Sequence, residues 1–145
     1  MNKILNNLIL ELHVPDFKSI QEFYSLLGFE LVLEDTATDK ERGYMVLKRK
    51  DALGETILNF YGNTNEVSKH KHFVQFPEGT PRGYAVEITI PVEDIEEFWN
   101  KTKAVLTKES ISQELEMKSF GKKDFRLTDP AGFYLRFTEL VDLGQ

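Results

Sequence analysis

Residues 8–29 combine a short strand, a sharp stop and an amphipathic helix, and this order restricts the folds open to the chain. Leu8, Leu10 and Leu12 recur at every second position, which is the period of a half-buried strand. Pro15 cannot donate a hydrogen bond to a neighbouring strand, so we expect the strand to end beside it. The order is therefore strand, turn, helix and sharp stop, and we expect it to begin the first βαβββ module of an α+β fold.

Both ends of the helix are marked in the sequence. Ser19, with Glu22 three residues later, predicts a capping box at the start of the helix. Apolar residues then recur at helical spacing as far as Leu27. Gly28 follows at the position where a left-handed C-cap favours glycine, and a second strand is expected to begin directly afterwards, at Phe29.

The second half of the chain repeats this plan more weakly. Residues 92–94 correspond to residues 14–16, and the turn at 129–132 corresponds to the turn at 51–54. We expect strands at about 4 or 7 to 13, 29–34, 43–49, 56–61, 84–90, 113–118, 124–128 and 133–138, and helices at about 19–27 and 95–105. Because one such unit cannot cover its own sheet, the repeat predicts two βαβββ modules that share one structure.

The length of 145 residues fits one domain, which we expect to span residues 1–145. Module one is expected at about 4–62 and module two at about 83–140. The connection at about 63–82 is rich in glycine, asparagine, proline and charge. A connection of this length in a compact domain is usually functional or mobile.

The composition excludes several classes of function. The net charge of -6 and the pI of about 5.1 disfavour a nucleic-acid groove, which needs a basic face. The chain has no cysteine, which excludes disulfides, thiolate metal sites and cysteine nucleophiles. The N-terminal residues offer neither a signal peptide nor a membrane span. We therefore expect a cytoplasmic protein with no nucleic-acid partner and no membrane partner.

Four segments together resemble the vicinal oxygen chelate superfamily of glyoxalases, bleomycin-resistance proteins and extradiol dioxygenases. They are VPD at 14–16, EFY at 22–24, LGFE at 27–30 and DPAGFYLRF at 129–137. The resemblance covers nearly the whole chain. It implies two βαβββ modules whose curved mixed sheets surround a concave cavity, with the helices on the convex side. It also implies that modules pair within a chain or across a homodimer.

In the enzymes of this superfamily, a divalent metal is held by His, Gln or Glu side chains from the first and last strands of each module. The corresponding positions here are Ile9, Asn59 (Leu58 if the turns are aligned without a gap), Glu87 and Arg136. A hard divalent cation needs about three protein ligands from histidine and carboxylate. Ile9 offers no ligand, and Arg136 is a permanent cation that repels a metal. We therefore predict no metal and no cofactor, as the bleomycin-resistance branch implies.

The resemblance and the strand alternation together predict a ligand-binding set on the concave face. The set consists of Ile9, Glu11, Asn59, Tyr61, Glu87, Tyr134 and Arg136. Glu87 and Arg136 are expected to pair across the cavity as a partly buried ion pair. No catalytic residue is predicted. The function that follows is the sequestration of a small molecule, whose identity the sequence does not reveal, by a homodimer.

Three alternatives remain open. A metal-dependent superfamily enzyme, such as a lactoylglutathione-lyase-like isomerase, a dioxygenase or a thiol transferase, would need a site rebuilt from Glu11, His13, Glu87 or residues 70–72. Within residues 70–72 two histidines could form a metal pair, although a solvated loop is the simpler interpretation. Glu11 and Glu87 could also serve as paired carboxylates in acid–base chemistry. The last alternative is a partner-binding module that uses its dimer surface.

Overall fold

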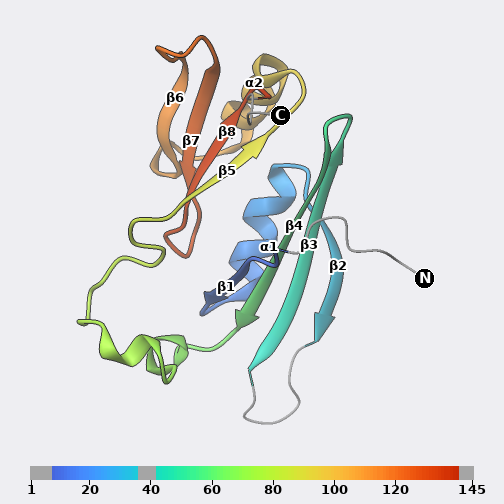
Figure 1. Ribbon diagram of the computed structural model, residues 1–145. Helices are drawn as coiled ribbons and strands as arrows, with labels where there is room; N and C mark the ends of the chain where they lie inside the picture. Colours follow the sequence, from blue (N-terminus) through green and yellow to red (C-terminus); the bar gives the residue numbers. More distant parts are fainter. Residues whose placement is uncertain (1–7, 36–41, 141–145) are drawn as a thin grey trace.

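The computed structural model describes residues 8–35 and 42–140, which form two βαβββ modules joined by a long connection (Figure 1). Module one consists of β1 (Glu11–Val14), α1 (Phe17–Leu26), β2 (Glu30–Asp35), β3 (Gly43–Asp51) and β4 (Gly54–Gly62). Module two consists of β5 (Glu87–Pro91), α2 (Ile95–Val105), a 3-10 turn (Lys108–Ser110), β6 (Ile111–Met117), β7 (Lys123–Thr128) and β8 (Tyr134–Thr138). The predicted α+β class with two βαβββ modules is confirmed.

Each module forms a four-stranded mixed sheet, and the two sheets have the same topology. The strand order is β1-β4-β3-β2 in the first, called sheet A here, and β5-β8-β7-β6 in the second, called sheet B. In both sheets the first strand pairs in parallel with the last, and the remaining pairs are antiparallel. This matching topology confirms the internal repeat.

One face of each sheet packs against the helix of its module, and the two halves contribute to one hydrophobic core. Ile20 and Tyr24 are buried in α1, as are Ile95 and Trp99 in α2. Because strand residues alternate between faces, the opposite face of each sheet carries most of the polar side chains; we call it the open face. In the described part of the chain, no helix is long and apolar enough to cross a membrane.

The start of α1 differs from the prediction, and its end agrees with it. Asp16 is the N-cap, and its carboxylate accepts hydrogen bonds from the backbone N–H groups of Lys18 at 3.3 Å and Ser19 at 3.0 Å. The predicted capping box at Ser19 is therefore wrong, because the helix begins at Phe17 and Ser19 lies inside its first turn. Gly28 has φ +89°, which confirms the left-handed C-cap.

The first strand is shorter than the leucine alternation predicts. β1 begins only at Glu11, and residues 4–7 lie outside the described residues. Leu12 is buried and Leu10 packs partly against the core, whereas Leu8 is exposed. The inward-facing set therefore ends at Leu10, because the ladder to β4 starts at Glu11.

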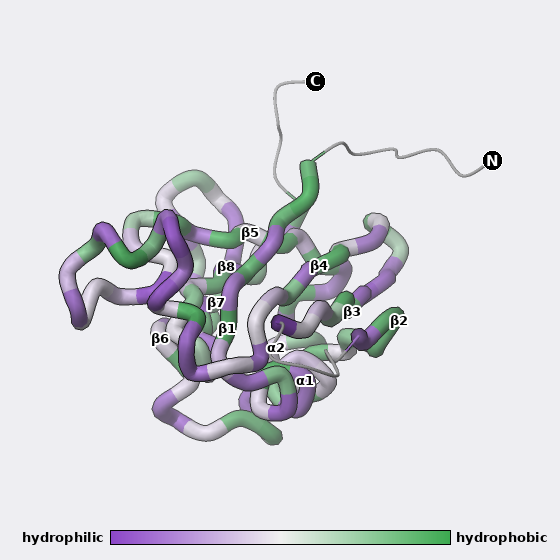
Figure 2. Tube along the Cα trace, turned by 90° about the horizontal axis from the view of Figure 1, so that it is seen from below, coloured by the Kyte–Doolittle hydropathy of each residue, from purple (hydrophilic) through white to green (hydrophobic). Residues whose placement is uncertain are grey.

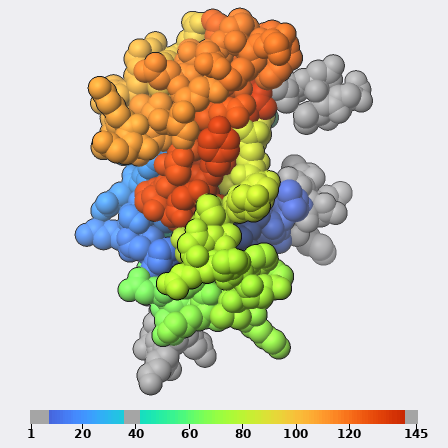
Figure 3. All heavy atoms as spheres, turned by 90° about the vertical axis from the view of Figure 1, so that its left-hand side faces the viewer, coloured from blue at the N-terminus to red at the C-terminus, as the bar shows by residue number. Residues whose placement is uncertain are grey.

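The connection between β4 and β5 contains two 3-10 turns, Val67–Lys69 and Phe73–Gln75. It lies at the surface of the molecule (Figure 3). Arg82 ties its far end to module two by donating a hydrogen bond to the carbonyl of Ala131 at 3.2 Å. The strand predicted over residues 84–90 starts only at Glu87, so its first part belongs to the connection.

A buried hydrogen bond joins the two modules. The hydroxyl of Tyr24 in α1 donates to Oδ2 of Asp129 at 2.7 Å. The other carboxylate oxygen of Asp129 accepts from the backbone N–H groups of Ala131 and Phe133, both at 2.9 Å. Burial raises the pKa of Asp129, against the opposing effect of these donors. One carboxylate thus closes the turn before β8 and ties it to the helix of module one.

We expect Tyr24→Phe to lower the free energy of unfolding by about 1–3 kcal/mol, because it leaves a buried carboxylate oxygen without its donor. Urea unfolding followed by circular dichroism measures the change. The matched control is Tyr84→Phe, at a tyrosine that is 74% exposed, for which we expect a change within about 0.5 kcal/mol. Equal losses in the two variants would show that the hydrogen bond does not stabilise the fold.

Candidate functional site

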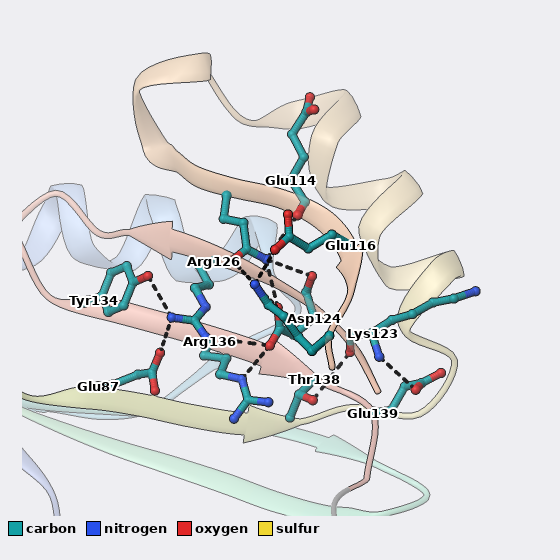
Figure 4. Close-up of polar contacts among 12 residues, drawn as sticks. Glu87, Glu114, Glu116, Lys123, Asp124, Arg126, Tyr134, Arg136, Thr138 and Glu139 are labelled. Atoms are coloured by element: carbon teal, nitrogen blue, oxygen red, sulfur yellow. Dashed lines mark hydrogen bonds and ion pairs between the residues drawn. The ribbon is translucent and has the colours of Figure 1, made fainter. Parts of the chain in front are cut away.

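The open face of sheet B carries a connected group of polar side chains, shown in Figure 4. β7 contributes Asp124 and Arg126, β8 contributes Tyr134 and Arg136, and β5 contributes Glu87. Successive strand residues point to opposite faces, so these side chains share one face, while most of the residues between them are buried on the other. We call these five residues the sheet B cluster.

Asp124 is fully buried and lies at the centre of the cluster. Its Oδ1 accepts from Nε2 of Gln113 at 2.8 Å and lies 3.8 Å from Nζ of Lys118. Its Oδ2 accepts from Nε of Arg136 at 2.7 Å and lies 3.8 Å from Nη2 of Arg126. Burial alone would raise the pKa of Asp124, but the hydrogen bonds from Gln113 and Arg136 and the charge of Lys118 hold this pKa below its ordinary value.

Arg126 links the first strand of module two to the last. Its Nη1 lies 2.9 Å from Oε1 of Glu87 and donates to the hydroxyl of Tyr134 at 3.1 Å. The hydrogen bond to Tyr134 and the charge of Glu87 raise the pKa of Arg126 above its already high ordinary value. The guanidinium is therefore a permanent positive charge on the open face.

The predicted ion pair between Glu87 and Arg136 is wrong. In the register of β5 and β8, Arg136 lies opposite Thr89, two residues beyond Glu87. Glu87 pairs with Arg126 instead, and Arg136 pairs with the central aspartate. Sequence reasoning missed both true partners. The alternation of charged and apolar residues over 124–128 is the signal that could have identified them.

The open face of sheet A holds three of the four predicted ligand-binding residues of module one: Glu11, Asn59 and Tyr61. Its register places Glu11 opposite Asn59 and His13 opposite Tyr61. Oε2 of Glu11 lies 3.2 Å from Nε2 of His13, and the rings of His13 and Tyr61 have centroids 4.8 Å apart. Ile9 precedes β1 and is exposed. Apart from Ile9, the predicted residues thus belong to two sets, one on each sheet.

The two histidines of the connection are engaged in local hydrogen bonds. Nδ1 of His70 accepts from the backbone N–H of His72 at 3.1 Å, and Nδ1 of His72 accepts from Nε2 of Gln75 at 3.1 Å. Both Nδ1 atoms therefore have a partner within the connection itself. Residues 8–35 and 42–140 contain no group of three or more histidine, cysteine or acidic side chains that could hold a metal ion.

His13 packs among the rings of the connection. Its ring centroid lies 5.2 Å from that of His70 and 4.9 Å from that of Phe73, both edge to face. Burial lowers the pKa of His13, although the charge of Glu11 opposes the shift. The arrangement favours a neutral His13 that anchors the connection to β1.

The positions at which the sequence resemblance would place a divalent metal do not fit one. Ile9 has no donor atom, and Asn59 offers only an amide. Glu87 is engaged by Arg126, and Arg136 is itself a cation. A metal bound there would have to displace an ion pair and lie close to two guanidinium groups, which repel it.

The lowered pKa of Asp124 predicts a dependence of stability on pH. The ionised carboxylate contributes stability above the ordinary pKa of 3.8, and this contribution is lost as the pH falls through the lower pKa of the folded state. We expect Asp124→Asn to lower the free energy of unfolding at neutral pH by about 1–3 kcal/mol and to flatten its decline in acid. Urea unfolding at a series of pH values measures both effects.

The control for this experiment is Asp35→Asn, at an exposed aspartate at the end of β2. In this variant, the free energy of unfolding should decline as the pH falls in the same way as in the wild type. An Asp124→Asn variant whose stability falls with pH as steeply as that of the wild type would refute the role assigned to the buried carboxylate.

Comparisons with known proteins connect this geometry to a fold. The sequence matches no protein-family model and no curated protein. Among solved structures, it is similar to a bleomycin resistance determinant encoded on the transposon Tn5, with 23% identity, a TM-score of 0.63, and coverage of 92% of this chain and 97% of that one.

Two further structures agree with this match. A bleomycin-binding protein complexed with bleomycin has 24% identity and a TM-score of 0.63, covering 94% of this chain and 99% of that one. A member of the glyoxalase/bleomycin resistance protein/dioxygenase superfamily from Sphaerobacter thermophilus has 17% identity and a TM-score of 0.59, covering 94% and 100%. At these identities the matches establish a shared fold.

Proposed function

Because the chain has the vicinal oxygen chelate fold of glyoxalases, bleomycin-resistance proteins and dioxygenases, we propose that it binds and sequesters a small molecule without using the superfamily's metal site. The observation that carries this proposal is the sheet B cluster. There, Glu87 and Arg136, which stand at two of the metal positions, are each held in an ion pair. Those pairs support recognition by hydrogen bonds and charge, and they oppose the binding of a divalent cation.

A ligand site on the open faces has further support. One protein of similar fold was solved in complex with bleomycin. In this chain, the two open faces combine aromatic rings with charged groups, which is the usual composition of a small-molecule site. The proposed ligand-contact residues are Ile9, Glu11, Asn59, Tyr61, Glu87, Tyr134 and Arg136.

We further propose that residues 1–145 form one domain and that the protein acts in the cytoplasm. The shared core and the buried bond between Tyr24 and Asp129 support one cooperative unit. The absence of cysteine and the acidic charge are compatible with that compartment.

We expect no stoichiometric metal in protein purified without chelator, and no rise in melting temperature when zinc, nickel, cobalt, manganese or iron(II) is added. A metal that bound only the folded state would raise the melting temperature by mass action. The same assay with a panel of small molecules, bleomycin included, should identify compounds that stabilise the protein. Mass spectrometry of each bound compound after release should show it chemically unchanged.

One tightly held metal per site, lost in Glu87→Ala and retained in the exposed control Glu114→Ala, would contradict this proposal and favour the metal-dependent enzyme. Conversion of a bound compound into a product would likewise overturn sequestration.

We also propose that the protein is a homodimer. The end strand β2 carries three consecutive apolar residues, Leu31, Val32 and Leu33, which are between 43% and 57% exposed. Figure 2 shows this hydrophobic stretch at the outer edge of the molecule. An exposed apolar end strand favours association, because a second chain that covers it removes apolar surface from water. Light scattering during size-exclusion chromatography should give twice the mass of one chain; a monomer mass would refute the dimer.

A further inference from the structure

Two arginines of the sheet B cluster lie directly opposite each other. The register of β7 and β8 pairs Arg126 with Arg136, and both side chains are on the open face. Like charges at directly opposed positions of neighbouring strands repel each other. Asp124 offsets this repulsion, because its Oδ2 lies 2.7 Å from Nε of Arg136 and 3.8 Å from Nη2 of Arg126. One buried carboxylate therefore serves two guanidinium groups.

That carboxylate leaves part of each guanidinium without an acceptor. The oxygens of Asp124 are already shared with Gln113 and Lys118. Among the described residues, Nε of Arg126 and Nη2 of Arg136 are buried and have no hydrogen-bond partner. Most buried donors in proteins do find a partner, and those that do not call for an explanation. The sheet B cluster therefore holds two buried guanidinium N–H donors that no acceptor of the described residues satisfies.

The chemistry of these N–H donors determines which kind of ligand group could accept their hydrogen bonds. A guanidinium offers only N–H donors, and its planar fork matches the oxygens of a carboxylate or a phosphate. A cationic group such as an ammonium has no lone pair with which to accept these hydrogen bonds. A neutral carbonyl could accept a bond, but its hydrogen bonds with guanidinium are weaker than those of an anion.

An aromatic ring lies against the guanidinium of Arg136. The ring of Phe120 has its centroid 5.3 Å from Cζ of Arg136. Phe120 belongs to the hairpin between β6 and β7, is 57% exposed, and is followed by Gly121 at φ +83°. A ring on a surface hairpin can turn aside to admit a ligand, and its face can then contact an apolar part of that ligand.

We infer that Arg126 and Arg136 form an anion-receiving subsite for a small molecule that bears a carboxylate or phosphate next to an aromatic or apolar group. This inference deepens the proposed ligand-binding function and rests on it. The oxyanion would accept from the free guanidinium N–H groups, while the apolar part of the ligand would lie against Phe120.

The test uses the intact protein and follows the Nε–Hε resonances of its arginines by NMR while benzoate or phenyl phosphate is added. Arg126→Lys and Arg136→Lys assign the two resonances. We expect at least one of the two anions to shift both resonances at millimolar concentration. Benzyl alcohol, which has the same ring without the charge, should not shift them. A response to benzoate alone would indicate a carboxylate ligand, and a response to phenyl phosphate alone a phosphate ligand.

Binding constants provide the second measurement. Arg136→Lys keeps the positive charge beside Asp124 but loses the planar fork, so it should weaken anion binding by about tenfold or more. The matched control Arg42→Lys makes the same exchange at an arginine whose Nη2 contacts the carbonyl of Glu66, and it should bind as the wild type does.

Two outcomes would overturn the subsite: equal shifts with benzyl alcohol, or no shift with either anion. If a neutral or cationic compound then stabilised the protein without moving these resonances, the sequestration role would stand and only the anion subsite would fall.

Discussion

A four-stranded sheet packed against a single helix can bury only one of its faces, and the rest of this structure follows from that constraint. In each module, α1 or α2 covers the apolar face and completes a common core. The other face must carry side chains that are suited to contact with water, with a ligand or with another chain. The two open faces differ in composition. That of sheet A carries His13 packed against Tyr61, and that of sheet B carries the ion pairs of Arg126 and Arg136.

The charges on sheet B are held in place by a carboxylate that water does not reach. Asp124 is fully buried, and a buried charge is tolerated only when partners surround it. Gln113, Lys118 and Arg136 supply those partners, so the strands β6, β7 and β8 are coupled through one side chain. The same coupling orients the arginines toward the open face. Stability and the proposed recognition therefore depend on one group of residues.

The two modules also share a buried polar contact. Asp129 closes the turn before β8 and accepts the hydroxyl of Tyr24 from α1. The Asp-Pro-Ala-Gly segment, which contributed to the sequence resemblance, thus has a structural role here. It is therefore part of the scaffold that presents Arg136 rather than part of the surface that we propose binds the ligand.

Local patterns in the sequence were sufficient to predict the repeat, the order of the elements and the C-cap at Gly28. They also carried the resemblance to the superfamily, whose fold the solved structures share with this chain. These features depend on residues that are close together along the chain, because the spacing of apolar residues and the residue types at turns determine local structure. The N-cap was misassigned because Asp16 and Ser19 both suit that position. Tertiary structure alone decided that Glu87 and Arg136 have separate partners, because strand register determines which side chains meet across a sheet.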